Sequence, residues 1–143
     1  ILHADSQLSS GWSEAAAALL GQPGQGAYFR RAFRSTARAA RIVAGWANLR
    51  ARAFGLPYGD QGLLLHRDTL AKIGGIPDIP LMEDVALARA LKGRLIMLDA
   101  EARTSPARYE AEGWLTRGSR NLITLIRYLA GADPHDLAKA YNR

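Results

Sequence analysis

Residues 76–91, which read IPDIPLMEDVALARAL, constrain the fold more than any other stretch of the chain. A proline fixes its own φ and disfavours the α region for the residue before it, so Pro77 and Pro80 predict an extended lead-in. Apolar residues then recur at helical spacing, at Leu81, Val85, Ala88 and Leu91. Glu83 and Asp84 are therefore predicted to open a helix that packs on a core.

The acidic pair has two interpretations. In the first, Glu83 and Asp84 are surface residues whose negative charge is favoured at the positive end of the helix dipole. In the second, they carry chemistry, because carboxylates at the mouth of a helix are held in a fixed place. The choice depends on which other polar groups the chain can bring to them.

The amino-acid composition limits the kinds of molecule that the chain is expected to bind. The 143 residues have the size and balance of one globular domain, and the net charge of +6 is carried mostly by arginine. Arginine favours phosphate or carboxylate groups, so nucleic acid, a nucleotide and an anionic membrane surface all fit. The absence of cysteine excludes disulfides, thiolate catalysis and Cys-ligated zinc. No run of about 18 apolar residues appears, so we expect a cytoplasmic protein that is soluble or peripheral to a membrane.

Strand and helix patterns alternate, which predicts an α/β fold of one domain, with a mixed sheet flanked by helices and a helical C-terminus. The strand patterns fall at residues 27–33, 63–66 and 94–99, and residues 1–2 resemble the tail of a further strand. The helix patterns begin after residues 9–10, at 35–36, at 68, at 83, at 114 and at 134. Residues 104–113 read as an irregular polar segment.

Two amphipathic stretches leave alternatives open. The helix expected to end near residue 53 has an apolar side that we expect to be buried, formed by Ala39, Val43, Trp46, Leu49 and Ala53. Its arginine stripe of Arg34, Arg38 and Arg41 is either a solvated face or a contact for an acceptor phosphate or lipid head group. The stretch from residue 114 carries Leu115, Leu122, Ile126 and Leu129 on one side and either packs on the core or lies on a bilayer.

Few residues are left as candidates for chemistry. A Gly-x-Ser-x-Gly elbow, a P-loop and a Gly-x-Gly-x-x-Gly turn are all absent. What the chain offers is Asp5 after an apparent strand, the glycine-rich loop 55–62 and the acidic pair of residues 83 and 84. These parts suit a reaction in which a cation holds a diphosphate and a carboxylate takes a proton.

At this point the sequence resembles a known family. Residues 2–8, LHADSQL, are similar to the Asp-x-Asp region of family 2 glycosyltransferases of GT-A fold, with histidine in place of the first aspartate. Residues 57–62, 74–77 and 81–89 resemble the acceptor half of the same enzymes, in the bacterial subgroup named as radical-SAM/selenodomain-associated transferases. These blocks cover most of residues 1–114.

The resemblance implies roles for particular residues. Asp5 would bind a divalent metal, Mg²⁺ or Mn²⁺, that bridges the nucleotide diphosphate, and Asp84 would be the general base with Glu83 in support. His3 and Arg108 would contact the donor diphosphate. The acceptor would be bound by Tyr58, Asp60, Gln61, Tyr109 and Trp114. Arg108 and Tyr109 match only the end of the family's Gln-x-x-Arg-Trp motif, with tyrosine in place of tryptophan.

The resemblance also implies that the βαβ units that bind the nucleotide would precede Ile1. We therefore expect the C-terminal part of a GT-A domain, with residues 1–112 as its catalytic and acceptor half and 113–143 as its C-terminal helices. The expected activity is an inverting, metal-dependent transfer of a sugar from a nucleotide-diphosphate donor to an acceptor hydroxyl. The alternative is a non-catalytic basic module that binds nucleic acid or an anionic membrane, although the aromatic interleaving of single-strand binders is missing. Membrane contact and self-association into a homo-oligomer both stay open.

Overall fold

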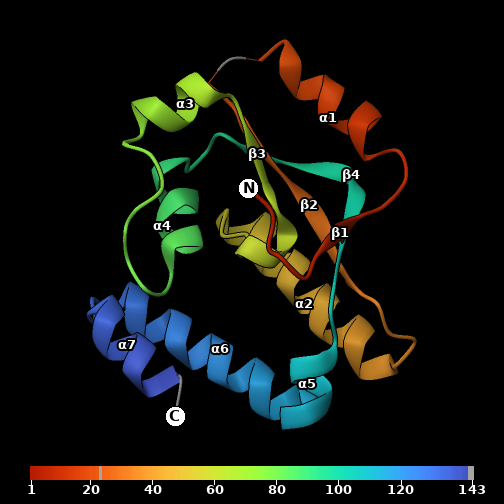
Figure 1. Cartoon of the computed structure of the whole chain (residues 1–143), viewed down its shortest axis with the longest axis vertical. Coiled ribbons are helices and arrows are strands. Elements are labelled where there is room, and N and C mark those ends of the chain that lie inside the picture. The colour runs from red at the N-terminus through yellow and green to blue at the C-terminus, as the bar shows by residue number, and fades with distance from the viewer. Residues whose placement is uncertain (23, 142–143) are drawn as a thin grey trace.

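A computed structural model of the chain describes residues 1–22 and 24–141 and has an α/β fold with a four-stranded mixed sheet (Figure 1). The strands are β1 (Gln7–Leu8), β2 (Gly26–Phe33), β3 (Leu63–Leu65) and β4 (Leu95–Thr104), in the order β1-β4-β2-β3. Strands β2 and β4 are parallel, and the other two neighbouring pairs are antiparallel. The α/β class with a mixed sheet and flanking helices is therefore confirmed.

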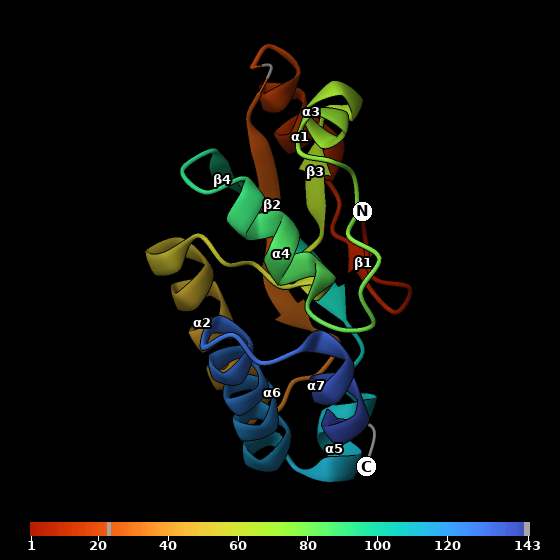
Figure 2. The same cartoon turned by 90° about the vertical axis from the view of Figure 1, so that its left-hand side faces the viewer.

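The helices gather at the two ends of the sheet. They are α1 (Trp12–Leu20), α2 (Arg38–Phe54), the 3-10 turn η1 (Gly59–Gln61), α3 (Arg67–Lys72), α4 (Glu83–Ala90), α5 (Ala107–Glu112), α6 (Trp114–Leu129) and α7 (Pro134–Tyr141). In both views α1 and α3 lie at one end of the molecule, whereas α5, α6 and α7 lie together at the other (Figures 1 and 2). The carboxyl ends of the parallel strands β2 and β4 point toward the second group.

The centre of the core is the β2–β4 pair. Its buried residues are Ala27, Phe29, Leu98, Ala100 and Ala102, and Leu19 of α1 packs on them. Strand β4 is longer than the predicted segment 94–99, because a bulge between Leu98 and Glu101 restores the pairing with β2 and carries it on to Thr104. Beyond the bulge, Ala102 and Thr104 are buried while Arg103 is exposed, so the alternation of a strand is present there.

The stretch 76–91 folds as predicted. Helix α4 begins at Glu83, and Val85, Ala88 and Leu91 are each no more than 1% exposed. Met82, directly before the helix, has a positive φ of 69°, a conformation that costs a non-glycine residue roughly 1 kcal/mol. Its side chain is buried against Val85 and Leu125, which holds that backbone in place.

Three predictions about local structure are wrong. Residues 104–113 are not irregular, because α5 forms there and Tyr109 packs edge-on against Phe33. Residues 1–2 are in no strand, although Ile1 exchanges two backbone hydrogen bonds with Leu63 at the open edge of β3. Helix α2 begins at Arg38 instead of residues 35–36.

The buried face of α2 was also predicted wrongly, and of the two alternatives for the apolar side of α6 the structure does not show packing on the core. In α2 the sheet side carries small residues and one arginine, Ala40, Ala44, Ala47, Arg50 and Ala51, whereas Trp46 and Leu49 are more than half exposed. In α6 the buried residues are Arg117, Thr124 and Leu125, whereas Leu115 is 84% exposed. Small side chains let α2 approach the sheet closely, and the polar residues of α6 turn inward to a hydrogen-bonded network described below.

Gly62 gives the first testable prediction. Its φ is +64°, and an added Cβ would lie 3.1 Å from carbon atoms of Leu2 and Phe29. We expect Gly62→Ala to lower the free energy of unfolding by about 2 kcal/mol, from strained backbone and crowding together. The control is Gly45→Ala in α2, where a Cβ meets nothing within 4 Å, and which should raise stability by about 0.5–1 kcal/mol. Urea denaturation of both variants measures the difference; equal stabilities would contradict the packing around Gly62.

Candidate functional site

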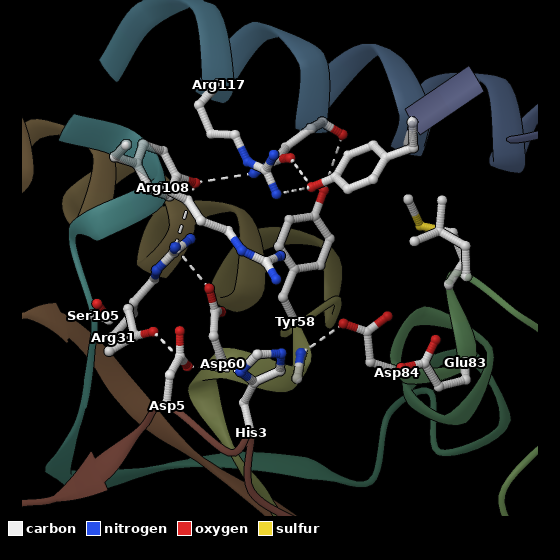
Figure 3. A pocket seen from close by; sticks show the side chains of 17 residues that line it. His3, Asp5, Arg31, Tyr58, Asp60, Glu83, Asp84, Ser105, Arg108 and Arg117 are labelled. Carbon is white, nitrogen blue, oxygen red and sulfur yellow. Dashed lines mark hydrogen bonds and ion pairs between the residues drawn. The ribbon is translucent and has the colours of Figure 1, made fainter. Parts of the chain in front are cut away.

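A cavity of about 220 Å³ lies at the carboxyl ends of β2 and β4, between the sheet and helices α4 to α7 (Figure 3). This end of a parallel strand pair is where ligands bind in open α/β sheets. Every predicted site residue except Gln61 and Trp114 lines it: His3, Asp5, Tyr58, Asp60, Glu83, Asp84, Arg108 and Tyr109. Segments more than 100 residues apart in the sequence therefore meet in one place.

Asp84 is held by backbone amides at the mouth of α4. Its Oδ2 accepts a hydrogen bond of 2.6 Å from the Gly59 N–H, and its Oδ1 accepts one of 2.7 Å from the Val85 N–H. Burial raises the pKa of this carboxyl, and the negative charge of Glu83 adds to the rise against the opposing effect of the two amides. Asp84 is thus a positioned carboxylate that accepts a proton more readily than an ordinary aspartate.

Asp5 lies on the other side of the cavity. His3 Nδ1 is 2.6 Å from its Oδ1, and the hydroxyl of Thr104, at the end of β4, donates to the same oxygen at 3.1 Å. Burial raises the pKa of Asp5, but the hydrogen bond and charge of His3, with the Thr104 and Ser6 hydroxyls, outweigh it and leave the pKa below its usual value. Asp5 therefore stays ionised.

A buried ion pair forms the floor between these carboxylates. Arg31 of β2, with a side chain only 4% exposed, places Nη2 2.6 Å from Oδ2 of Asp60 in η1. Within residues 1–22 and 24–141, Arg31 Nε and Asp60 Oδ1 are buried and have no hydrogen-bond partner. Buried polar atoms are nearly always paired in folded proteins, so these two atoms predict a polar ligand or water in the cavity.

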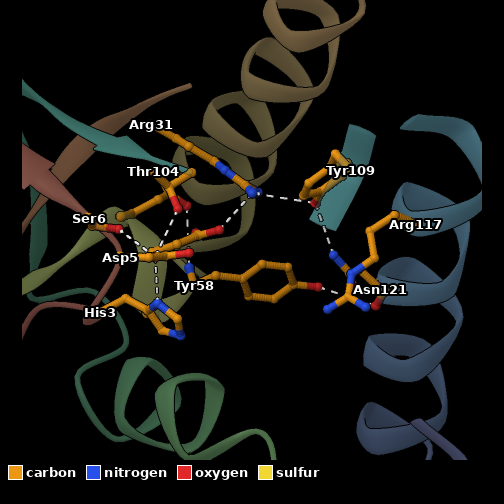
Figure 4. A network of polar contacts seen from close by, with 12 residues as sticks. His3, Asp5, Ser6, Arg31, Tyr58, Thr104, Tyr109, Arg117 and Asn121 are labelled. Atoms are coloured by element: carbon orange, nitrogen blue, oxygen red, sulfur yellow. Dashed lines mark hydrogen bonds and ion pairs between the residues drawn. The ribbon is translucent and has the colours of Figure 1, made fainter. Parts of the chain in front are cut away.

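A hydrogen-bonded network connects the pair to the C-terminal helices (Figure 4). Arg31 Nη2 also donates to the Tyr109 hydroxyl at 3.3 Å, and Asn121 Nδ2 donates to the same hydroxyl at 2.9 Å. The Tyr141 hydroxyl donates to Asn121 Oδ1 and accepts from Arg117, whose Nη1 lies 2.8 Å from Glu112. Helices α6 and α7 therefore belong to the cavity wall.

Tyr58 stands at the centre of the cavity. The Arg50 guanidinium lies 3.4 Å from the centroid of its ring, and its hydroxyl donates to the Asn121 carbonyl at 3.5 Å. Burial raises the pKa of Tyr58 to about 12, more than the Arg50 charge lowers it, so the phenol stays protonated at neutral pH. It presents a hydroxyl and an aromatic surface to whatever enters.

Two of the predicted acceptor residues lie outside the cavity. Gln61 is fully buried and bonds to Tyr58 N, Phe29 O and Asn48 Oδ1, so it fixes the loop that carries Tyr58 and Asp60. Trp114 stacks on Tyr109 with ring centroids 5.1 Å apart. Both residues support neighbours that do line the cavity.

Four residues of the network that links β2 to α6 and α7 line the cavity but were not predicted as site residues: Arg31, Arg117, Asn121 and Tyr141. Arg31 alternates with Phe29 and Phe33 on one side of β2, and an arginine on the apolar side of a strand needs an anion or solvent, so that signal could have identified Arg31. The three others lie on α6 and α7, where a periodic pattern cannot tell an inward polar residue from a solvated one. Only their contacts in the folded structure show that these three residues line the cavity.

Few side chains of the described residues could bind a metal ion in this cavity. The described part of the chain contains no group of three or more His, Asp and Glu side chains placed to hold a metal ion. Among those residues, all hydrogen bonds to the Asp5 carboxylate go to Oδ1, so Oδ2 can take a ligand, and His3 adds a nitrogen. Mg²⁺ is often held by only one or two carboxylates together with substrate phosphates and water, so Asp5 fits such a shared site.

Comparisons with protein-family models, with curated proteins and with solved structures find no match. The resemblance to family 2 glycosyltransferases therefore stays a prediction that rests on residue types, on their order and on the cavity that they form.

Proposed function

We propose that this chain carries the catalytic, acceptor-side part of an inverting glycosyltransferase that uses a nucleotide-diphosphate sugar, in a GT-A-like arrangement. The observation that carries the proposal is that Asp84, a half-buried carboxylate with a raised pKa, lines the same cavity as Arg108 and as Arg31 and Arg117, which are paired with Asp60 and Glu112. A base is needed for the acceptor hydroxyl, and cations are needed for the leaving diphosphate.

The proposed reaction is a single displacement. The acceptor hydroxyl oxygen attacks the anomeric carbon of the sugar, its proton passes to Asp84, and the bond from that carbon to the diphosphate oxygen breaks. Arginine side chains stabilise the charge that develops on the leaving nucleoside diphosphate. Each oxygen of Asp84 accepts one backbone N–H and keeps a lone pair, so the carboxylate can accept the proton without leaving its position.

The other residues of the cavity hold the reactants. Glu83 lies beside Asp84 and raises its pKa. Tyr58, Asp60 and Tyr109 present the hydroxyl and carboxylate groups that would bind the hydroxyls of a sugar acceptor. The cavity is smaller than the roughly 300–1,000 Å³ of most small-molecule sites, so it would hold part of a nucleotide sugar.

Asp5 and His3 would hold a divalent metal, Mg²⁺ or Mn²⁺, together with oxygens of the diphosphate. When bound, such a metal supplies positive charge that neutralises the leaving group. Asp60 Oδ1 and Arg31 Nε, which have no hydrogen-bond partner among the described residues, are further groups that polar atoms of the substrate could bind.

Nucleotide binding tests the proposal. We expect uridine or guanosine diphosphate with Mn²⁺ to raise the melting temperature of the intact protein, in which the nucleotide-binding units expected before Ile1 complete the donor site, since a ligand present at 100 times its Kd stabilises the native state by about 2.7 kcal/mol. Asp5→Asn should remove the Mn²⁺-dependent part of this shift. The control is Asp99→Asn, because the Asp99 side chain is 97% exposed on the bulge of β4.

The opposite result would favour the rival function. If no nucleoside diphosphate shifts the melting temperature with or without Mn²⁺, and the chain instead binds DNA with a steep salt dependence, a basic nucleic-acid-binding module is the better description.

A further inference from the structure

A second surface, away from the cavity, exposes an unusual number of large apolar side chains. On α2 these are Ile42, Trp46, Leu49 and Phe54, and on α6 they are Leu115, Leu122, Ile123, Ile126 and Leu129. Their exposure ranges from 36% for Leu122 to 84% for Leu115. Scattered exposed apolar residues are common on proteins, but clusters of this kind mark contact surfaces.

The exposed residues follow the period of a helix. On α2, residues 42, 46 and 49 are spaced i, i+4, i+7, and on α6, residues 115, 122, 126 and 129 also fall on one face. The two helices contact each other and lie side by side in the structure (Figure 2). Trp114, at the start of α6, packs in the same apolar cluster as Ala40 and Val43 of α2. We call the seven exposed residues of the two stripes, Ile42, Trp46, Leu49, Leu115, Leu122, Ile126 and Leu129, the α2–α6 face.

The side of α6 opposite this face already contacts the cavity and the core. Arg117 and Asn121 point into the cavity, and Leu125 packs on Met82 and Val85. The apolar side of α6 therefore is not part of the core of the described chain, although packing on the core was one of the two alternatives that the sequence left open.

The charged residues of the two helices all have one sign. Neither α2 nor α6 contains an aspartate or a glutamate. Arg38, Arg41 and Arg52 of α2 and Arg127 of α6 are exposed. A surface that combines apolar residues with unopposed arginines is complementary to an apolar layer that carries negative charge.

We propose that the α2–α6 face docks on the surface of an anionic bilayer. The apolar side chains enter the boundary between head groups and acyl chains, Trp46 lies at the interface that tryptophan prefers, and the arginines bind anionic head groups. No helix in residues 1–22 and 24–141 is long and apolar enough to cross a bilayer. A second copy of the chain fits less well, because a two-fold contact through this face would bring arginines against arginines.

Vesicle co-sedimentation tests this docking. We expect the chain to bind vesicles of 70% phosphatidylcholine and 30% phosphatidylglycerol at low salt, and to bind vesicles of phosphatidylcholine alone at least tenfold more weakly. Each arginine near an anionic surface contributes about 1 kcal/mol, so Arg38→Gln/Arg41→Gln/Arg52→Gln should weaken binding about a hundredfold. The matched control removes three exposed cations elsewhere, Arg67→Gln/Lys72→Gln/Arg89→Gln, and should weaken it by much less.

The contribution of the apolar side chains to vesicle binding is tested with a second set of variants. Trp46→Ser/Leu49→Ser should weaken vesicle binding at least tenfold, whereas Trp12→Ser/Ile76→Ser, which removes exposed apolar residues outside the face, should not. Brominated lipids should quench the fluorescence of the unmodified chain, and Trp46→Phe should abolish most of that quenching. The substitutions for both measurements, vesicle binding and fluorescence quenching, are at surface residues, so the variants are expected to stay folded. Circular dichroism checks their folding.

Three results would overturn the proposal. One is a folded chain that binds no anionic vesicle at low salt. Another is binding that the control variants weaken as much as the variants of the face do. The third is a concentration-dependent dimer that Trp46→Ser/Leu49→Ser dissociates, without vesicle binding, which would assign the face to self-association. The docking does not rest on the transferase proposal, and nucleotide binding tests that one separately.

Discussion

Asp84→Asn is expected to lower the turnover of a nucleotide-sugar donor by about a hundredfold to ten-thousandfold, the usual contribution of a general base. The substitution keeps the shape of the side chain and removes its ability to take a proton. The measurement is release of nucleoside diphosphate by the intact protein, including the nucleotide-binding units expected before Ile1, from a panel of uridine and guanosine diphosphate sugars, with water as the acceptor in the absence of a known one. Asp78→Asn, in the same lead-in but exposed and outside the cavity, is the control and should keep the parent rate.

The pH dependence gives an independent check on the same residue. The base works only when ionised, so the rate should fall as pH is lowered through the raised pKa of Asp84, above the ordinary aspartate value of 3.8. The stability that this carboxyl contributes has the opposite sign, because its folded pKa exceeds its unfolded pKa. That contribution is present below pH 3.8 and is lost as pH rises through the folded pKa. Asp84→Asn turnover at the parent rate would exclude Asp84 as the base.

Asp60→Leu is expected to have the largest effect on stability. Arg31 is 4% exposed and Asp60 is 20% exposed, so removing the carboxylate leaves a buried, uncompensated guanidinium. Breaking such a pair from one side costs about 3 kcal/mol or more, equivalent to a fall in melting temperature of roughly 10 °C for a domain of this size. Calorimetry measures this directly.

The double variant Arg31→Met/Asp60→Leu distinguishes a lost ion pair from lost packing. Removing both charges takes away the desolvation penalty, so the double variant should recover most of the stability that Asp60→Leu loses. Asp136→Asn is the exposed comparison, because Asp136 is 70% exposed and pairs with an equally exposed Lys139, and it should change the melting temperature little. A double variant as unstable as the sum of the two single variants would contradict a coupled pair.

The sequence predicted the parts of this molecule that depend on local patterns. Prolines, the acidic pair and an apolar stripe defined α4, and alternation defined β2, because both signals arise within a few residues. The convergence of Asp5, Asp60 and Asp84 on one cavity was expected only through the family resemblance. Periodicity alone places residues on faces and cannot say which faces meet.

The failures have a common physical cause. In α2 the most apolar face was assigned to the core, and in α6 the core was one of two alternatives, yet the fold buries Arg50 and Arg117 and exposes Trp46 and Leu115. Arg50 is satisfied by the Leu56 carbonyl and the ring of Tyr58, and Arg117 by Glu112 and Tyr141. A buried arginine is stable only with such partners, and they come from distant segments that a helical pattern does not contain.

The wall of the cavity is built from both ends of the described chain. The contact of Thr104 with Asp5 spans 99 residues and that of Arg31 with Tyr109 spans 78, while α7 closes the far side with Tyr141. Contacts of such long sequence separation require large loops to close, which slows folding and makes it cooperative. A ligand that binds in the cavity contacts segments from both ends of the described chain, so its binding stabilises the folded arrangement that brings those segments together.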